Sequence, residues 1–362
     1  MKAYEIAVVH GDGIGPEVCQ AAIDVVRAAL GSSQSLRFVE YRAGAEEYRR
    51  TGIAYPPESV EGCRRAAAIL HGAAGLPGVT YPDGTEAGLD FGLLTRFRLD
   101  LYANIRPIRL FPGVASRLAG KRAGDIDYVI VRENTEGLYA ARGNGVVLRD
   151  EVATDTLMIT RKGTERVVRA AFELARKRRG APTDGRHRVT CCDKSNVLRS
   201  YAFFRRVFDD VAASYPDIEA DYCYADAMTV HLIERPEFYD VIVAENMFGD
   251  IISDLAAATV GSMGMSPSAE IGDSHGLFQA AHGSAPTIAG KGIANPYGTI
   301  LSAASMLLWL GNRHADAELA QAGTAIEAAV ARTLNEGNAL SRDIGGTATT
   351  REIADAVSRN LT

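Results

Sequence analysis

The sequence predicts an α/β protein of two domains, in which short buried strands alternate with amphipathic helices. Two β-branched runs bounded by polar residues, Tyr128–Val131 and Val241–Ala244, have the pattern of strands that are covered on both faces of a parallel sheet. Segments with helical periodicity lie between them, as a parallel sheet requires. The chain has 362 residues, which is enough for two domains at roughly 150 residues each.

The composition is that of a globular protein. Hydrophobic residues make up 47% and charged residues 23%, which excludes a disordered tail, a collagen-like repeat and a coiled coil. The net charge of −6 argues against a nucleic-acid partner, which would need a basic surface. No apolar stretch reaches the roughly 20 residues of a membrane span, so no membrane partner is expected.

The cysteines indicate a reducing compartment. There are five, an odd and sparse number for a disulfide framework, and no C-x-x-C motif is present. Cys191 and Cys192 lie side by side in an apolar run, which predicts buried free thiols. The N-terminal apolar run is too short for a signal peptide and is broken by Asp12. We therefore expect a soluble, cytoplasmic protein.

The elements follow one another in α/β order. The chain opens with a strand at Glu5–Val9, a glycine turn, and a helix with Pro16 in its first turn. The Gly143-Asn144-Gly145 sequence followed by Val146–Leu148 predicts a hairpin-like insert within Gly137–Ile159. The other expected elements are strands at Leu36–Tyr41, Ala66–Leu70 and Ile218–Ala225, and helices at Thr164–Arg178, Ser200–Ser214, Ile251–Ala258 and Ala303–Leu310.

The glycine turn resembles a dinucleotide-binding loop but does not fit the Rossmann pattern. Gly11-x-Gly13-x-Gly15 is followed by Pro16, so G-x-G-x-x-G fails, and starting at Gly13 fails because residue 18 is Val. A glycine-rich turn into a helix still offers backbone N–H groups to an anion. From the loop alone, nucleotide contact and a purely structural turn both stay open.

An acidic pair is a candidate metal site. Asp250 and Asp254 are four residues apart in a predicted helix and therefore share one face. Two like charges at this spacing repel each other, and a hard divalent cation would remove that repulsion. Asp226, which follows a predicted strand, is a plausible third ligand. The alternative is an ordinary solvated acidic face.

Three arginines, a tyrosine and a lysine are further candidates. Arg96, Arg106 and Arg132 lie at the ends of predicted elements, and converging guanidinium groups would suit a di- or tricarboxylate. Taken singly, each arginine fits a surface salt bridge better than a substrate site. Tyr139 lies in a segment expected to be exposed, and Lys194 follows a strand. A catalytic lysine would need a lowered pKa, which nearby cations could provide.

Several ordered motifs together resemble the β-decarboxylating 2-hydroxyacid dehydrogenases. This family includes the isopropylmalate, isocitrate, homoisocitrate and tartrate/D-malate dehydrogenases. The resemblance extends over nearly the whole chain, from GDGIGPEV at Gly11–Val18 to GGTATTREIADAV near the C-terminus. Its most specific blocks are NIRP with FPG (Asn104–Gly113), VRENTEGLY (Val131–Tyr139), DKSNVL (Asp193–Leu198), ENMFGDIISD (Glu245–Asp254) and HGSAPTIAGKGIANP (His282–Pro296).

The resemblance implies a role for each candidate residue. Tyr139 and Lys194 match the acid/base pair, and Arg96, Arg106 and Arg132 match the arginines that bind the substrate carboxylates, with Arg98 as the alternative to Arg96. The cation would be Mg²⁺ or Mn²⁺, bound by Asp226, Asp250 and Asp254. The residues that match the NAD-binding loop are His282, Gly283, Ser284, Ala285, Thr287, Ile288 and Asn295.

The resemblance also implies the architecture. The fold would be the isopropylmalate/isocitrate dehydrogenase-like two-domain open sheet, which is not a Rossmann fold. Residues 1–101 and 262–362 would form a discontinuous cofactor-binding domain, and 102–261 a substrate, metal and dimerisation domain with a hairpin clasp near 137–160. The active site would be shared in a homodimer, because Lys194 and Asp226 would come from the other subunit.

Two departures concern the cofactor. Thr287 stands where NAD-using members of the family carry an Asp that binds the adenosine ribose, and no cation at Thr287 or Ile288 is available for the 2′-phosphate of NADP. We therefore predict NAD, bound more weakly than usual. Gln279-Ala280-Ala281 replaces the more usual Glu-Pro-Val before His282, and His10 stands where Pro is common.

The substrate is the least constrained part of the prediction. The Ser-Leu-Asn signature of isocitrate enzymes is absent before Arg96, and Leu93 and Leu94 could line an apolar pocket for an isopropyl group. This favours oxidative decarboxylation of 3-isopropylmalate to 2-oxoisocaproate in leucine biosynthesis. The stretch Leu89–Leu94 also resembles tartrate/D-malate enzymes, and Asp90 would favour a polar substituent. Isocitrate and homoisocitrate are less favoured substrates than these.

A third kind of function is a non-catalytic regulatory subunit. Such a subunit would be expected to lack Tyr139, Lys194 or one of the aspartates. All of them are present, so the sequence favours a catalytically competent enzyme.

Overall fold

The computed structural model describes residues 3–33 and 35–361 and has the predicted α/β class. Its contacts divide the chain into two compact units, which are described separately. Unit 1 comprises Met1–Leu101, Phe111–Ala115 and Gly261–Thr362, and unit 2 comprises Tyr102–Leu110 and Ser116–Val260. The short stretch Phe111–Ala115 thus belongs with unit 1, although the sequence analysis placed it within 102–261.

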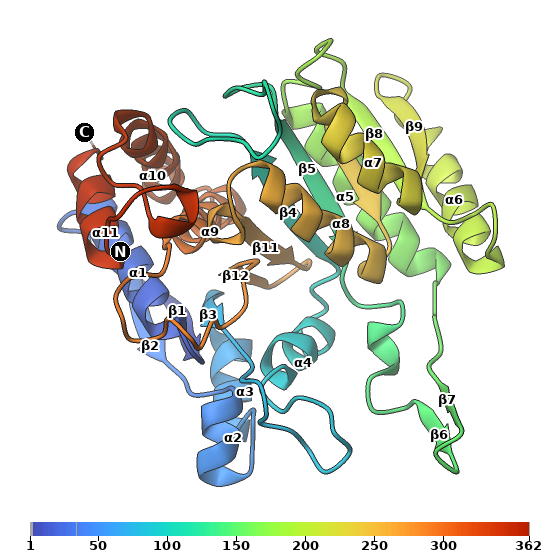
Figure 1. Cartoon of the computed structure of the whole chain (residues 1–362), viewed down its shortest axis with the longest axis horizontal. Helices are drawn as coiled ribbons and strands as arrows, with labels where there is room; N and C mark the ends of the chain where they lie inside the picture. Colours follow the sequence, from blue (N-terminus) through green and yellow to red (C-terminus); the bar gives the residue numbers. More distant parts are fainter. Residues whose placement is uncertain (1–2, 34, 362) are drawn as a thin grey trace. The chain divides into compact units, whose positions relative to one another are not determined.

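The strands of unit 1 follow the order β2-β1-β3-β12-β11 (Figure 1). β1 pairs in parallel with β2 and β3, β12 pairs in parallel with β3, and β11 pairs antiparallel with β12. Their bounds are Tyr4–Gly11 (β1), Leu36–Glu40 (β2), Ala68–Ala73 (β3), Pro267–Ile271 (β11) and Gly276–Ala280 (β12).

Helices cover both faces of the unit 1 strands. Ala7 and Val9 of β1 pack in one apolar cluster with Cys63 and Phe91, and the alternate residues of the strand point to the opposite face, where α1 and α9 pack. The helices are Gly15–Leu30 (α1), Ala45–Thr51 (α2), Pro57–Arg65 (α3), Asp90–Arg98 (α4), Tyr297–His314 (α9), Ala317–Glu336 (α10) and Thr350–Arg359 (α11).

The strands of unit 2 follow the order β4-β5-β10-β8-β9. β5, β10, β8 and β9 are parallel neighbours, and β4 is antiparallel to β5. Their bounds are Ala103–Arg109 (β4), Asp127–Glu133 (β5), Arg188–Asp193 (β8), Glu219–Tyr224 (β9) and Val241–Ala244 (β10).

In unit 2, α5 (Arg161–Lys177) and α6 (Arg199–Ala212) pack on one face of these strands. The buried core there includes Val131, Phe172 and Phe208, together with Cys191. α7 (Ala225–Glu234) and α8 (Asn246–Thr259) lie on the other face (Figure 1). A separate antiparallel hairpin, β6 (Val146–Leu148) and β7 (Val152–Thr154), occupies the insert that the sequence predicted.

Cys191 and Cys192 were predicted to be buried free thiols. The cysteines are free and buried, and burial raises the pKa of both Cys191 and Cys192 well above the usual thiol value. None of the helices formed by the described residues combines the length and the apolar character that a membrane span requires.

The parallel strands of unit 2 position the candidate residues. In open α/β sheets, ligands bind beyond the carboxyl ends of parallel strands. Arg132 lies at the end of β5, Lys194 directly follows β8, and Asp226 lies in the first turn of α7 after β9. Asp250 and Asp254 lie on α8, which follows β10.

Candidate active site

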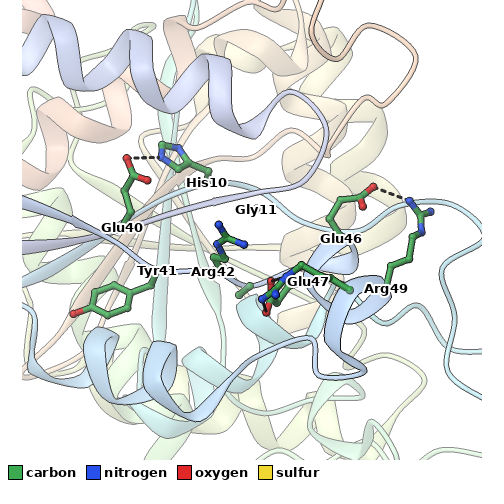
Figure 2. Close-up of a pocket in the computed structure, with 10 residues that line it drawn as sticks. His10, Gly11, Glu40, Tyr41, Arg42, Glu46, Glu47 and Arg49 are labelled. Atoms are coloured by element: carbon green, nitrogen blue, oxygen red, sulfur yellow. Dashed lines mark hydrogen bonds and ion pairs between the residues drawn. The ribbon is translucent and has the colours of Figure 1, made fainter.

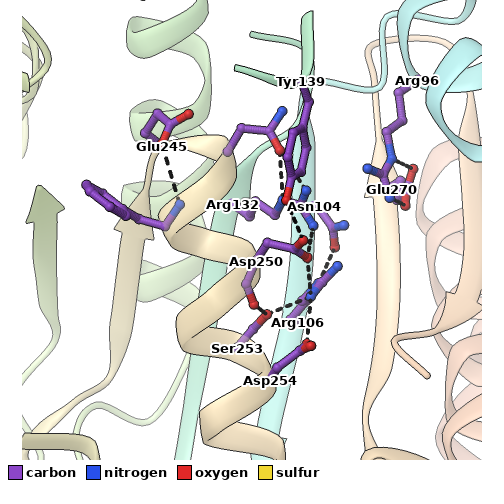
Figure 3. A network of polar contacts seen from close by, with 12 residues as sticks. Arg96, Asn104, Arg106, Arg132, Tyr139, Glu245, Asp250, Ser253, Asp254 and Glu270 are labelled. Atoms are coloured by element: carbon purple, nitrogen blue, oxygen red, sulfur yellow. Dashed lines mark hydrogen bonds and ion pairs between the residues drawn. The ribbon is translucent and has the colours of Figure 1, made fainter. Parts of the chain in front are cut away.

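Two buried arginines form the centre of a polar cluster in unit 2 (Figure 3). Arg106 is 4% exposed and Arg132 is 1% exposed, and they come from the neighbouring strands β4 and β5. The Arg106 side chain donates to Ser253 Oγ at 2.6 Å and lies 3.3 Å from Asp250 and 3.6 Å from Asp254. Two buried cations therefore face the acidic pair of α8.

Arg132 connects β5 to the beginning of α8. Its Nε and Nη2 donate to Asn246 Oδ1 at 3.0 and 2.7 Å, and its Nη1 forms an ion pair with Asp250. Gly249 permits this close approach, because a Cβ there would lie 2.7 Å from the Arg132 side chain. The N-cap of α8 is Glu245, whose carboxylate accepts from the Phe248 N–H.

Tyr139 joins the same cluster. Its hydroxyl donates to Asp250 Oδ2 at 3.0 Å, and the Arg132 guanidinium lies over its ring at 5.3 Å. Tyr139 is half-buried in a short turn, Tyr139–Ala141. Asp250 thus contacts both arginines and the phenol, while 33% of its side chain stays accessible to solvent.

Asp254 is the more open of the two carboxylates. Its side chain is 58% exposed and forms an ion pair with Arg106. Partial desolvation raises the pKa of Asp254, Arg106 acts in the opposite direction, and the neighbouring Asp250 adds to the rise. The two carboxylates therefore repel each other on their shared helix face. A bound cation would relieve this repulsion, so the pair suits a metal site.

Lys194 and Asp226 form a separate pair. Lys194 Nζ lies 2.5 Å from Asp226 Oδ1, and this hydrogen bond lowers the pKa of the Asp226 carboxyl. Asp226 is 69% exposed and does not join Asp250 and Asp254. Within the part of the chain that the structure describes, no three carboxylate, histidine or cysteine side chains are grouped to hold a metal.

The first predicted arginine lies in unit 1 and has an internal partner. Arg96 donates from Nε and Nη2 to the two carboxylate oxygens of Glu270 at 2.9 and 2.7 Å (Figure 3). Glu270 is fully buried and also accepts from Gln279 at 2.8 Å. Arg98, the alternative, stacks over the Tyr55 ring at 5.6 Å.

The two leucines of the predicted pocket lie on the same helix as Arg96. Leu94 packs partly against the apolar cluster around Phe91, and Leu93 is half-buried. Asp90, at the start of α4, accepts a hydrogen bond from the Tyr81 hydroxyl.

The predicted cofactor loop of unit 1 lies against the glycine turn. The Ile14 N–H donates to the Ser284 carbonyl at 2.8 Å, and Ser284 Oγ donates to the Gly75 carbonyl at 2.5 Å. Gly13 has a φ of +58°, and a Cβ there would lie 1.9 Å from the Ser284 oxygen, so only glycine fits. Ile288 packs with Ile14, whereas Thr287 is exposed.

The remaining residues of this loop are anchored at both ends. Burial lowers the pKa of His282, which keeps its imidazole neutral at pH 7. Asn295 accepts from the Tyr297 N–H at 3.0 Å, at the start of α9, and donates to Asp343 at 3.0 Å. Gly283 is exposed and Ala285 is half-buried with a φ of +39°.

Comparison with known proteins identifies the chain's relatives. The model of the family described as isocitrate/isopropylmalate dehydrogenase matches residues 5–357. The chain belongs to this family. It is 44% identical over 359 residues to the 3-isopropylmalate/3-methylmalate dehydrogenase of Methanocaldococcus jannaschii, with 99% of each chain covered. It is 42% identical over 372 residues to the 3-isopropylmalate dehydrogenase of Thermobifida fusca, with 99% and 98% covered.

A solved structure agrees with this assignment. The crystal structure of isocitrate dehydrogenase from Methylococcus capsulatus matches with a TM-score of 0.86 and 34% identity, over 99% of both chains. The predicted resemblance and the predicted fold are therefore confirmed. The chain is a decarboxylating dehydrogenase, and its family is in general NAD-dependent and needs a divalent metal.

In this dehydrogenase the structure also adds residues that the sequence analysis missed. Asn246 and Ser253 orient the two buried arginines, and Glu270 pairs with Arg96. Asp12 is 1% exposed and accepts from the N–H groups of Ala45, Glu46 and Gly75 at 2.8, 2.9 and 2.8 Å. A carboxylate in a glycine turn directly after a buried strand was the available signal for Asp12.

Proposed function

We propose that this protein oxidises and decarboxylates a 3-substituted malate with NAD and Mg²⁺ or Mn²⁺, and that its substrate is 3-isopropylmalate. The product would be 2-oxoisocaproate, a step of leucine biosynthesis in the cytoplasm. The observation that supports this most is the pair of buried guanidinium groups, Arg106 and Arg132, beside Asp250, Asp254 and the Tyr139 hydroxyl. The full-length similarity to proteins with these names supports the substrate.

The residues of the chain have distinct tasks in this reaction. Arg106 and Arg132 hold the malate carboxylates through charge-assisted hydrogen bonds, which fixes C2 and C3. Lys194 takes the proton of the C2 hydroxyl as C2 is oxidised. After CO₂ leaves, Tyr139 delivers a proton to C3. The hydroxyl proton that is lost is balanced by the proton gained at C3, so the reaction consumes no net proton.

The acidic side chains fit a divalent cation in kind. Asp250 and Asp254 offer partly exposed, hard carboxylate oxygens on one helix face, and Asp226 would supply a third. The cation would stabilise negative charge on the substrate oxygen at C2. Because Asp226 lies apart from the pair within one chain, the proposal requires Lys194 and Asp226 of the partner subunit at each site.

The loop of unit 1 fits a dinucleotide. Ser284 fixes the loop to the glycine turn, whose N–H groups and adjacent helix start suit an anion. Bound NAD would accept the hydride from C2. Thr287 is exposed and can hydrogen-bond a ribose hydroxyl, but it carries no charge to pair with a 2′-phosphate, which supports NAD over NADP.

A homodimer is supported by apolar side chains of unit 2 that are exposed in the single chain. The hairpin exposes Val146, Val147, Leu148 and Val152, α7 exposes Val230 and Ile233, and α8 exposes Ile251. Clusters of exposed apolar residues indicate an interaction surface. The α7 and α8 residues lie on the helices that bear Asp226 and the acidic pair. A partner on this surface would place the two halves of the site together.

A second candidate substrate is D-malate or tartrate. Asp90 and Tyr81 form a hydrogen-bonded polar pair at the start of α4, the helix that bears Leu93 and Leu94. A polar C3 substituent could use such a pair, whereas an isopropyl group would use the leucines. A 3-methyl group, as in the name of the M. jannaschii relative, is the smaller apolar alternative.

The substrate assignment is tested by NADH formation with Mg²⁺ or Mn²⁺ on a panel. The panel contains 3-isopropylmalate, 3-methylmalate, D-malate, tartrate, isocitrate and homoisocitrate, and each is repeated with NADP. The proposal predicts the highest kcat/KM for 3-isopropylmalate with NAD. A preference for tartrate or D-malate would instead assign recognition of the C3 substituent to Asp90.

The acid/base assignments are tested by Lys194→Ala and Tyr139→Phe. Each is expected to lower kcat by about 10²–10⁴-fold, as loss of a positioned proton-transfer group does, and to leave the dimer folded. Lys162→Ala and Tyr222→Phe are controls, since both side chains are exposed and lie outside the cluster. Wild-type turnover in either active-site variant would refute that residue's role, and full activity after thorough chelation would refute the metal site.

A further inference from the structure

Unit 1 contains a cavity bordered by several charged side chains, on the β2 side of the glycine turn (Figure 2). Its volume is about 640 Å³, which lies within the range of roughly 300–1,000 Å³ typical of small-molecule sites. The cavity lies beyond the carboxyl ends of the parallel strands β1 and β2, where Gly11 and Tyr41 line it. Open parallel sheets place ligands at such ends. Of the residues that line this cavity, Gly11 belongs to the glycine turn assigned above to the cofactor, and the others have no role in the proposed substrate, metal or cofactor sites.

The charged groups in the cavity wall are paired, with one exception. On α2, Arg49 pairs with Glu46 at 2.7 Å, and Arg50 pairs with Glu47 at 2.6 Å. On the opposite side, His10 Nε2 lies 3.5 Å from Glu40. These contacts use the three glutamates of the wall.

The exception is Arg42, which directly follows Tyr41 in the cavity wall. Within residues 3–33 and 35–361, its guanidinium has neither an ion-pair partner nor a hydrogen-bond acceptor. Figure 2 shows it directed into the space between the His10–Glu40 pair and the glutamates of α2. The five N–H donors of an arginine form a fork that matches a carboxylate or a phosphate.

We propose that this cavity is a binding site for a compact organic anion, which Arg42 holds through its carboxylate or phosphate group. The wall has three arginines and three glutamates, so its charges balance overall, but Arg42 is the arginine whose guanidinium is not held by any of these glutamates and is therefore available to a ligand. The Tyr41 and Ala43 side of the wall would contact the uncharged part of the ligand. This site goes beyond the proposed reaction and is distinct from the anion site of Arg106 and Arg132 in unit 2.

Isothermal titration calorimetry with two probes tests the proposal. Malonate tests for a carboxylate ligand, and inorganic phosphate tests for a phosphate ligand. The probe that binds shows which of these two groups the site recognises. We expect Arg42→Gln to weaken binding of that probe by about tenfold or more, corresponding to loss of a charge-assisted contact. Arg49→Gln removes the same charge from the same wall and should change the affinity by less than about twofold.

A third variant separates this site from the proposed active site. Malonate also fits Arg106 and Arg132, so the titration is repeated with Arg132→Gln. The Arg42-dependent binding should persist in that variant. Equal affinity of wild type and Arg42→Gln for both probes, absence of any binding to wild type, or binding that depends only on Arg132 would each overturn the proposal.

Discussion

The buried carboxylate of Asp12 should control the order of the loops around the proposed cofactor site. It accepts one N–H on Oδ1, from Glu46, and two on Oδ2, from Ala45 and Gly75. Asp12→Asn keeps a similar shape but replaces one acceptor oxygen by a donor amide. With the amide oxygen in the Oδ2 position, two hydrogen bonds remain, and the third becomes a contact between two donors.

The magnitude follows from this loss. A hydrogen bond to a charged group contributes about 1.5–3 kcal/mol, and a buried donor left unsatisfied costs about 1–3 kcal/mol. We expect Asp12→Asn to destabilise the local structure by about 2 kcal/mol, which corresponds to roughly 30-fold faster exchange of protected amides. Asp12→Ala removes all three acceptor contacts and should have a larger effect.

Hydrogen–deuterium exchange with mass spectrometry measures this effect locally. Exchange should accelerate in the peptides that contain α2 and Gly75, and NADH affinity should fall because Gly75 binds Ser284. Asp24→Asn is the matched control, since Asp24 is exposed on α1 and, among residues 3–33 and 35–361, its carboxylate accepts only from Gln20. Exchange within twofold of wild type at both segments of Asp12→Asn would refute the reasoning.

Three further predictions concern pH, cofactor and assembly. Burial raises the pKa of Glu133 from 4.5 to about 7, so the folded state binds its proton more tightly than the unfolded state, and stability is lost as pH rises from about 4.5 to 7. The free energy of unfolding of Glu133→Gln, measured in urea, should therefore rise relative to that of the wild type by up to about 3 kcal/mol between pH 5 and pH 8. A difference between the two proteins that does not change with pH would contradict this. Thr287→Asp should tighten NADH binding by about tenfold, with a fluorescence titration as readout and Thr287→Asn as the uncharged control; equal affinities would remove the loop from the ribose site. Val147→Asp should convert the dimer to monomer in light scattering, whereas Ile53→Asp, an equally drastic change on the exposed surface of unit 1, should not, and a persistent dimer would place the interface elsewhere.

The sequence predicted the positions of the main helices and strands better than their ends. The apolar run Ala303–Leu310 is the centre of α9, which extends from Tyr297 to His314. The predicted helix began too late because Ser302 is polar, yet inside the helix its hydroxyl donates to the carbonyl of Gly298, four residues earlier. α8 likewise begins at Asn246, five residues before the predicted start, because Glu245 caps it.

The site could be predicted only where neighbouring strands or one helix bring the residues together. Asp250 and Asp254 share a helix face, which spacing alone determines. The pairing of Arg96 with Glu270 joins residues 174 positions apart, and no local pattern contains it. Residue spacing likewise could not predict that Asp226 lies apart from the acidic pair. Only the resemblance suggested this separation, because it implied that Asp226 reaches the site from the other subunit.

The ion pairs of Asp250 have a consequence for the order in which ligands bind under the proposed function. Before any ligand arrives, this carboxylate is already neutralised by Arg106 and Arg132. A cation that binds alone must displace a guanidinium and leave it buried without a counterion, and a substrate that binds alone leaves the carboxylate uncompensated. When both bind, the cation takes the carboxylate and the arginines take the substrate, so each charge exchanges one partner for another. Substrate and cation should therefore bind with positive cooperativity, each increasing the affinity for the other by the same factor.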